Sequence, residues 1–126
     1  MQVEQTLKLD SVKAIIENLQ ATLPKVRSVI VARNDGLPMV QTEGRGDATK
    51  VAAMTATAIS LNKRIINIIE AGQLTETSIS GSDGQIMLYA AGPHAVLALT
   101  ADSKANVAMI NHKARLAAQL IGEVTS

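Results

Sequence analysis

Three segments of this 126-residue chain place apolar side chains on both faces of an extended backbone. Successive side chains of a β-strand point to opposite faces, so a strand that is buried on one side alternates apolar and polar residues. The run Val29-Ile30-Val31 does not alternate, and neither do the segments QIMLYAA and AVLALTA further along the chain. These segments therefore predict central strands of a sheet that is covered on both faces. Residues 39–42 and 74–80 are more polar, which is typical of edge strands.

Three helices are predicted by the apolar periodicity of the remaining segments. The first is expected to begin at the capping pair Asp10-Ser11 and to end before Pro24, which leaves residues 1–8 as a short flexible N-terminus. The second covers about residues 48–71 and is the longest element. A third helix closes the chain.

These elements follow the order α-β-β-α-β-β-β-α in one domain of residues 1–126. Short turns make consecutive strands antiparallel neighbours, and the two polar strands belong at the edges. A five-stranded antiparallel sheet with the spatial order 2-1-5-4-3 satisfies both conditions. The predicted fold class is therefore an α/β (α+β) sandwich, with helices 1 and 3 on one face of the sheet and helix 2 on the other.

The middle helix carries more apolar surface than contact with one sheet requires. An apolar arc of about 100° is enough for such a contact. One sector of this helix contains Val51, Met54, Ala58, Leu61, Ile65, Ile68 and Ile69. Ile59 and Ile66 widen it to about half of the circumference. The surplus favours self-association, in which two strand-3 edges pair and two middle helices lie side by side across a dyad. The alternative is that Ile59 and Ile66 are scattered surface residues.

Composition excludes several classes of function. With 12 basic and 11 acidic residues the net charge is +1, and Tyr89 is the only aromatic residue, so we expect no nucleic-acid partner. The absence of cysteine excludes disulfides and thiolate chemistry. No apolar run approaches the roughly 18 residues of a membrane span, and no signal peptide is recognisable. We therefore expect no membrane insertion and a cytoplasmic location.

Patterns for an active site are also missing. The phosphate-binding pattern G-x-x-x-x-G-K-[ST] is absent, and His94 and His112 lie on different predicted elements without metal-ligand spacing. No serine lies in a G-x-S-x-G elbow, and no pair of carboxylates suggests acid–base chemistry. We expect no catalytic residue, no cofactor and no metal, and hence not an enzyme. A small-molecule sensor stays open by analogy with other α/β sandwiches.

Several motifs occur together in a recognisable order. VRSVIVARNDGLPMVQT contains an Asp-Gly-Leu-Pro core at residues 35–38, and an alanine-rich helix follows it. The turn at residues 81–84 precedes QIMLYAAG, and ADSKANVAMINHKARLAAQLI closes the pattern. Over residues 12–121 this arrangement resembles the Roadblock/dynein light chain family in its prokaryotic MglB-like branch. The Asp-Gly-Leu-Pro core itself is interpreted as a hairpin turn, with Asp35 as a turn residue and no catalytic role.

The resemblance implies both a fold and a function. The fold of the family agrees with the topology expected above, and its members form homodimers or heterodimers through strand 3 and the middle helix. Such dimers serve as platforms for Ras-like small GTPases, and the MglB-like branch acts as a GTPase-activating partner. Other members are scaffolds or adaptors without activating activity. We expect a homodimeric regulator of a Ras-like GTPase; a dimeric scaffold is the alternative.

The same resemblance implies which residues form the two interfaces. The expected dimer interface comprises Thr55, Ile59, Asn62, Ile66, Thr75, Thr77 and Ile79. The expected GTPase-binding residues are Ala52, Ala56, Ser60, Lys63 and Asn67. Arg45 and Arg64 are candidates for an arginine that acts in trans on phosphoryl transfer. A solvated surface arginine is the favoured interpretation of both, so activation is expected to be indirect.

Overall fold

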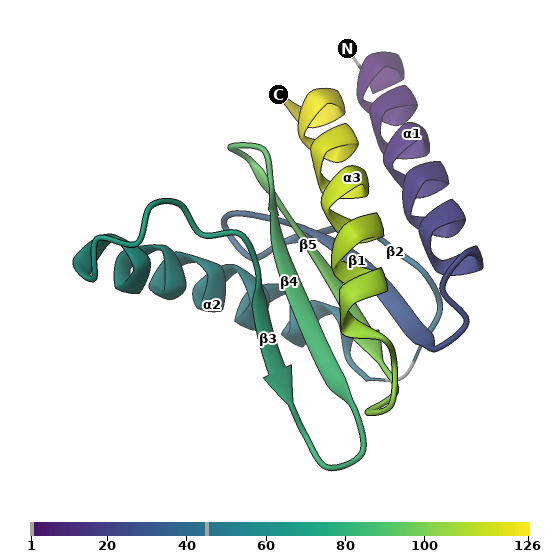
Figure 1. Cartoon of the computed structure of the whole chain (residues 1–126). Coiled ribbons are helices and arrows are strands. Elements are labelled where there is room, and N and C mark those ends of the chain that lie inside the picture. The colour runs from purple at the N-terminus through teal and green to yellow at the C-terminus, as the bar shows by residue number, and fades with distance from the viewer. Residues whose placement is uncertain (1, 45) are drawn as a thin grey trace.

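The computed structural model describes residues 2–44 and 46–126. Figure 1 shows three helices around one sheet, in the predicted order α-β-β-α-β-β-β-α. The elements are α1 (Gln2–Ala21), β1 (Val26–Arg33), β2 (Pro38–Gln41), α2 (Ala48–Ile68), β3 (Thr77–Ser80), β4 (Gln85–Ala91), β5 (Ala95–Ala101) and α3 (Val107–Thr125).

The five strands form one antiparallel sheet with the order β2-β1-β5-β4-β3, which confirms the predicted topology. The centre consists of β1, β5 and β4. The two four-residue strands, β2 and β3, are the edges, as their polar composition predicted. β3 pairs with β4 on one side only.

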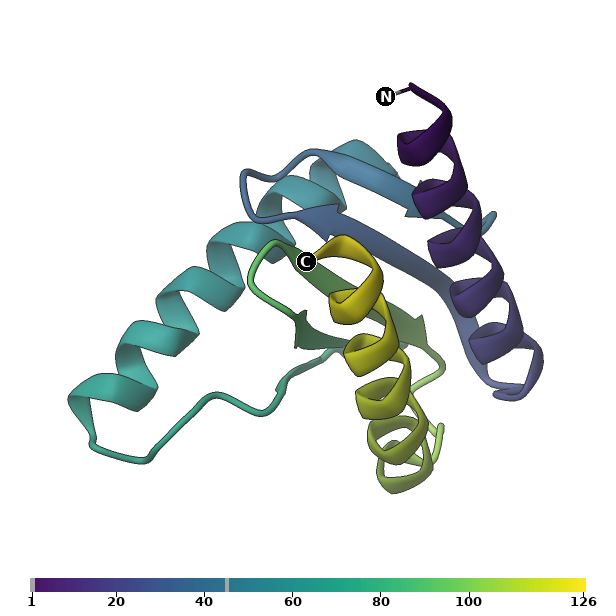
Figure 2. The ribbon, with the colours of Figure 1, turned by 90° about the horizontal axis from the view of Figure 1, so that it is seen from above.

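Helices cover both faces of the sheet. Val29 and Val31 of β1 pack in the core shared with α1 and α3, whereas Ile30 between them packs in the cluster that contains Ile59 of α2. Figure 2 shows the same arrangement from above, with α2 on one side of the sheet and α1 and α3 on the other. The expected placement of the helices is therefore confirmed, because alternate side chains of one strand meet different helices.

The core contains aliphatic side chains and one aromatic residue, Tyr89, which is 1% exposed. Close backbone contact also contributes at the β4–β5 turn. Gly92 has φ +73°, and a Cβ atom placed on it would lie 2.8 Å from Cα of Gly122 in α3. Glycine at position 92 thus satisfies both a left-handed backbone and a close approach to a helix.

The first helix begins earlier than expected. Asp10 and Ser11 do not cap it: α1 starts at Gln2, so residues 2–8 are its first turns. The segment QVEQTLKL contains good helix formers and no glycine or proline. Ser11 is accommodated inside the helix because its hydroxyl donates to the carbonyl oxygen of Leu7 at 3.0 Å, in place of the expected capping bond.

The boundaries of α2 agree better with expectation. Asp47 caps the helix, because its carboxylate accepts from the backbone N–H groups of Thr49 and Lys50 at 3.0 and 3.3 Å. The helix ends at Ile68, three residues before the expected end. Glu70 then adopts φ 56°, a left-handed conformation that stops the helix.

Candidate functional site

One side of α2 faces the sheet, and it is the side with small residues. Ala52, Thr55, Ala56 and Ile59 are all buried, with at most 7% of their surface exposed. Small side chains let a helix lie close to the sheet. The expected GTPase-binding role of Ala52 and Ala56 and the expected dimer-interface role of Thr55 and Ile59 are therefore wrong for this chain, because its own sheet covers these residues.

A second side of α2 is apolar and open to solvent. Met54, Leu61, Ile65 and Ile68 are exposed by 72%, 53%, 45% and 76%. We call these four residues, together with Ala58, the apolar side of α2. The sequence identified the sector correctly, but its orientation is the reverse of the expected one. Ile59, expected as surplus, packs on the sheet, whereas only Val51 and Ala58 of the sector pack against that cluster and its larger side chains are exposed.

The C-terminal half of α2 extends past the sheet. All four buried residues of the helix lie between Ala52 and Ile59. The C-terminal end of the helix projects beyond the sheet, as Figures 1 and 2 show. Ile66, expected in the interface, is half-buried, and Ile69 just after the helix is 63% exposed. A projecting helix with apolar side chains loses burial energy unless another surface covers it.

The β3 edge lies next to this exposed helix side. Thr77 and Ile79 pair with Leu88 and Ile86, which pack in the cluster on the α2 face, so both point toward α2. Thr77 is half-buried, and its hydroxyl accepts a hydrogen bond of 2.9 Å from the Asn62 amide. Two predicted interface residues, Asn62 and Thr77, therefore join α2 to β3 within one chain. Ile79 is 53% exposed, so its side chain is accessible at the β3 edge.

A groove separates the N-terminal half of α2 from β3 and β4. Its lining is almost entirely apolar and includes Val51, Met54 and Ala58 of α2 and Ile79 and Ile86 of the sheet. The outer edge of β3 beside it presents backbone groups that no other strand of the described chain pairs. Exposed apolar surface together with a free strand edge is typical of a protein interface.

The third side of α2 is polar. Its exposed residues, which we call the polar face, are Ala53, Thr57, Ser60, Lys63, Arg64 and Asn67. Three expected GTPase-binding residues, Ser60, Lys63 and Asn67, lie on this face and are accessible. Arg64, a candidate for action in trans, also lies here. The other candidate, Arg45, is outside the described residues.

A polar network fixes the segment that leads into β3. The Arg115 guanidinium donates to the Glu76 carboxylate at 2.6 Å, Asn111 donates to the same carboxylate at 3.5 Å, and the Tyr89 hydroxyl donates to Asn111 at 2.5 Å. Hydrogen bonding from Thr75, then from Arg115, lowers the pKa of Glu76 below its usual value. Thr75, an expected interface residue, is exposed and contributes to this network.

The pKa of Tyr89, in the same network, is shifted upward rather than downward. Burial, followed by the negative charge of Glu76, raises the pKa of its hydroxyl well above the usual range. The tyrosine is therefore neutral at physiological pH and donates its hydrogen bond to Asn111. Because the network joins β4, α3 and Glu76, it holds the start of the edge strand against the body of the domain.

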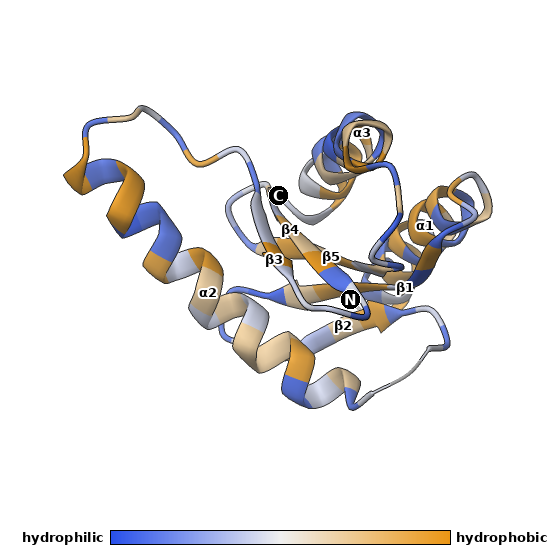
Figure 3. Ribbon diagram, turned by 60° about the horizontal axis from the view of Figure 1, so that its bottom comes forward, coloured by the Kyte–Doolittle hydropathy of each residue, from blue (hydrophilic) through white to orange (hydrophobic). Residues whose placement is uncertain are grey.

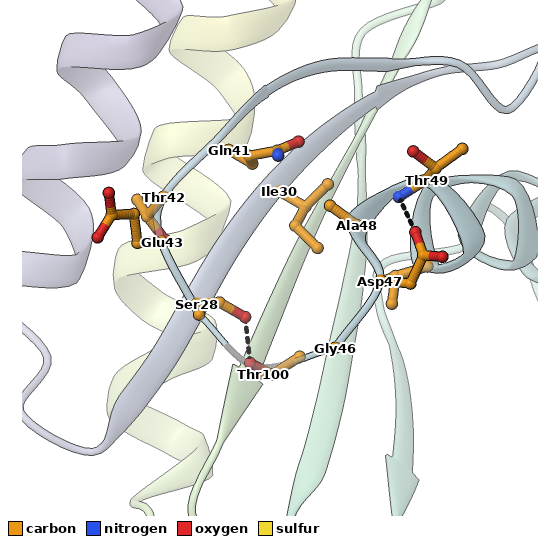
Figure 4. A pocket seen from close by; sticks show the side chains of 12 residues that line it. Ser28, Ile30, Gln41, Thr42, Glu43, Gly46, Asp47, Ala48, Thr49 and Thr100 are labelled. Carbon is orange, nitrogen blue, oxygen red and sulfur yellow. Dashed lines mark hydrogen bonds between the residues drawn. The ribbon is translucent and has the colours of Figure 1, made fainter.

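A polar pocket at the other end of α2 is drawn in Figure 4. It lies between β1, the chain after β2 and the N-terminus of α2, and Ser28, Thr42, Asp47 and Thr100 contribute to its lining. The hydroxyls of Ser28 and Thr100 are hydrogen-bonded to each other, and Asp47 is used by the helix cap. These groups already have hydrogen-bond partners in the chain, so their geometry gives no support to the ligand-sensor hypothesis.

Two negative findings apply to residues 2–44 and 46–126. No three acidic, histidine or cysteine side chains come together there in a way that could hold a metal ion. No helix in this part of the chain combines the length and the apolarity that crossing a bilayer demands.

The fold and the surface define a class of protein: an α+β sandwich with a free sheet edge beside an exposed apolar helix. The model of the Roadblock/LC7 domain matches residues 13–101, and the chain belongs to this family. A relative from Methanocaldococcus jannaschii, an uncharacterized protein, is 32% identical over 97 residues, which cover 76% of this chain and 84% of the relative.

Solved structures show the same fold at lower identity. The gliding protein MglB from Thermus thermophilus has a TM-score of 0.83 at 14% identity, over 93% of this chain and 90% of that chain. A second MglB structure, with a tetrameric arrangement, has a TM-score of 0.84 at 15% identity, over 93% of this chain and 89% of that chain. The fold is thus that of MglB.

Proposed function

We propose that this chain is a homodimeric regulator of the MglB-like branch, which binds a Ras-like small GTPase and stimulates its GTP hydrolysis. The observation that carries the proposal is the apolar side of α2 beside the free edge of β3. Exposed apolar surface of this extent on a helix needs a partner. The surface is also self-complementary, since one chain offers both a projecting apolar helix end and an apolar groove.

The geometry of the dimer follows from symmetry. Two β3 edges that pair antiparallel are related by a dyad perpendicular to the sheet. That dyad places the two α2 helices side by side and antiparallel on one face of a ten-stranded sheet. The projecting end of one helix, with Leu61, Ile65 and Ile68, then lies along the groove formed by Met54 and Ile79 of the partner copy. Each copy covers the apolar side of the other.

The proposal of a GTPase partner rests on the family to which the chain belongs, and not on the geometry of the chain. Roadblock-type dimers offer their paired middle helices to Ras-like GTPases, and the present chain has an accessible polar face on that helix. The tetrameric arrangement of one MglB structure supports self-association of this fold. The protein itself needs no active site for this function, because it acts on the catalytic residues of the GTPase.

Light scattering and single-turnover hydrolysis test the two halves of the proposal. A dimer mass at micromolar concentration is expected, and a monomer mass would refute the first half. A Ras-like GTPase from the same genome, loaded with GTP, should bind the dimer and hydrolyse GTP faster in its presence. Binding without acceleration would support the alternative, a dimeric scaffold or adaptor.

The role of Arg64 can be tested in the same assay. If Arg64 stabilised the transition state in trans, Arg64→Ala would lower the maximal rate by about a thousandfold or more. We expect indirect activation, so the rate at saturating protein should stay within about twofold of the unsubstituted protein. Saturation is essential because it separates a change in binding from a change in chemistry.

A further inference from the structure

The charge of this protein is distributed unevenly. α2 contains Lys50, Lys63 and Arg64 and no aspartate or glutamate between Ala48 and Ile68, which gives it a formal charge of +3. The whole chain has a net charge of +1, so the rest of the sequence carries −2. The longest helix of a nearly neutral protein is therefore entirely basic.

These charges have no structural use within one chain. Lys50, Lys63 and Arg64 are exposed, and the salt bridges among the described residues involve other side chains. No acidic residue lies three or four positions from Lys63 or Arg64, and Asp47, three positions before Lys50, accepts from backbone N–H groups as the helix cap. Interaction with the helix dipole is also excluded as their main role, because it acts within the last turn, which contains no basic residue.

Pairing of the helices would concentrate this charge. In the antiparallel arrangement both α2 helices lie on the same face of the joined sheets, so their basic residues lie on the same side of the dimer. Lys50 lines the groove in which the projecting end of the partner helix packs, whereas Lys63 and Arg64 lie outside that groove. Figure 3 shows the hydrophilic turns of α2 between hydrophobic ones along the projecting half of the helix. The dimer thus presents Lys63 and Arg64 of both copies, four positive charges, outside the paired apolar sides of α2.

We propose that this basic surface recognises an acidic patch on the Ras-like GTPase, so that the partner is selected by charge. The inference rests on the proposed function and specifies the chemistry of the partner surface. Charged groups at the rim of an interface steer association and make it sensitive to salt. An anionic membrane is the other macromolecule that such a surface could meet. The polar face disfavours it, because Ala53, Thr57, Ser60 and Asn67 offer no large apolar side chain for insertion.

Binding of the full chain to the GTPase, loaded with a GTP analogue, tests the proposal. The dissociation constant should rise at least about tenfold between about 50 and 300 mM NaCl. The double variant Lys63→Glu with Arg64→Glu should weaken binding at low salt by at least about thirtyfold. Its matched control is Lys8→Glu with Lys25→Glu, which changes the net charge equally at two exposed residues outside α2 and should bind as the unsubstituted protein does. Light scattering should show that both double variants remain dimers.

Four results would overturn the inference. Salt-independent binding, or equal weakening by the two double variants, would exclude recognition by α2 charge while leaving the proposed function intact. Loss of binding to vesicles of about one-third phosphatidylserine in the α2 variant, with GTPase binding unchanged, would assign the charge to a membrane. If the unsubstituted protein binds no Ras-like GTPase in either nucleotide state, the proposed function fails, and the inference fails with it.

Discussion

Replacement of Leu61 by aspartate should separate folding from dimerisation. Leu61 lies near the middle of the apolar side of α2, and 53% of its surface is exposed in the single chain. The sheet-facing residues of α2 lie on another side of the helix, so the substitution removes little from the core. If two α2 helices pair, however, position 61 of each copy becomes covered, and a carboxylate there is transferred from water into an apolar contact.

The expected magnitude follows from the exposed fraction. Full burial of a leucine side chain contributes about 1.5–3 kcal/mol, so the remaining half contributes ~1 kcal/mol in each copy and ~2 kcal/mol in the dimer. That loss alone raises the dissociation constant by about thirtyfold, which is the expectation for Leu61→Ala. Leu61→Asp adds the cost of removing two carboxylates from water, so its dimer should be weakened by more than about a hundredfold.

Sedimentation equilibrium over a range of concentrations measures this effect directly. Ser60→Asp is the matched control, because it adds the same charge at the adjacent position but on the polar face. Circular dichroism and urea unfolding confirm that both variants keep the fold. If Leu61→Asp dimerises as tightly as Ser60→Asp, the apolar side of α2 is not the dimer interface. In that case the proposed geometry is wrong even though the family assignment stands.

Four further predictions concern the stability of the domain. Leu97→Ala should lower the free energy of unfolding in urea by about 2–5 kcal/mol, because a fully buried side chain is replaced by a cavity. Gly92→Ala should destabilise more than Gly72→Ala in the same assay, since both have positive φ but only the first Cβ meets backbone atoms. Because the pKa of Glu76 is lowered by folding, its contribution is present at neutral pH and is lost as the pH falls below about 4.3; Glu76→Gln should show a shallower acid decline. Folding raises the pKa of Tyr89, so its effect on stability runs in the opposite direction: stability falls as the pH rises beyond about 10. Tyr89→Phe should lack that part of the fall.

The topology was predictable because the polarity of each strand indicates whether it lies at the centre or at an edge of the sheet. Strands without alternation had to be central, polar strands had to be edges, and short turns left one antiparallel order. The start of α1 was not predictable in this way. Asp10 and Ser11 resemble a cap, but a serine hydroxyl can also bond to a carbonyl one turn earlier inside a helix. Nothing in the local sequence separates these two uses.

The candidate site was predicted only in part. The error concerned which side of α2 faces the sheet. The apolar width of α2 indicated more apolar surface than the sheet covers, and large apolar side chains of the helix are indeed exposed. Ile59 was expected as surplus, whereas it faces the sheet together with Ala52 and Ala56, and Ile65 and Ile68 of the sector are exposed. In a helix with two apolar sides, hydrophobicity alone does not distinguish the side that meets the sheet from the side that meets a partner. The small size of three of the four sheet-facing residues, Ala52, Thr55 and Ala56, was the signal that distinguishes the two sides.

The single aromatic residue has a spectroscopic consequence. Tyr89 is the only source of intrinsic protein fluorescence in this chain, and it lies in the core on the α1 and α3 face of the sheet. The apolar side of α2 and the β3 edge contain no chromophore of this kind. Tyrosine emission therefore reports unfolding of the domain. The binding of a GTPase that contains tryptophan can be followed by selective excitation of tryptophan, which this protein lacks.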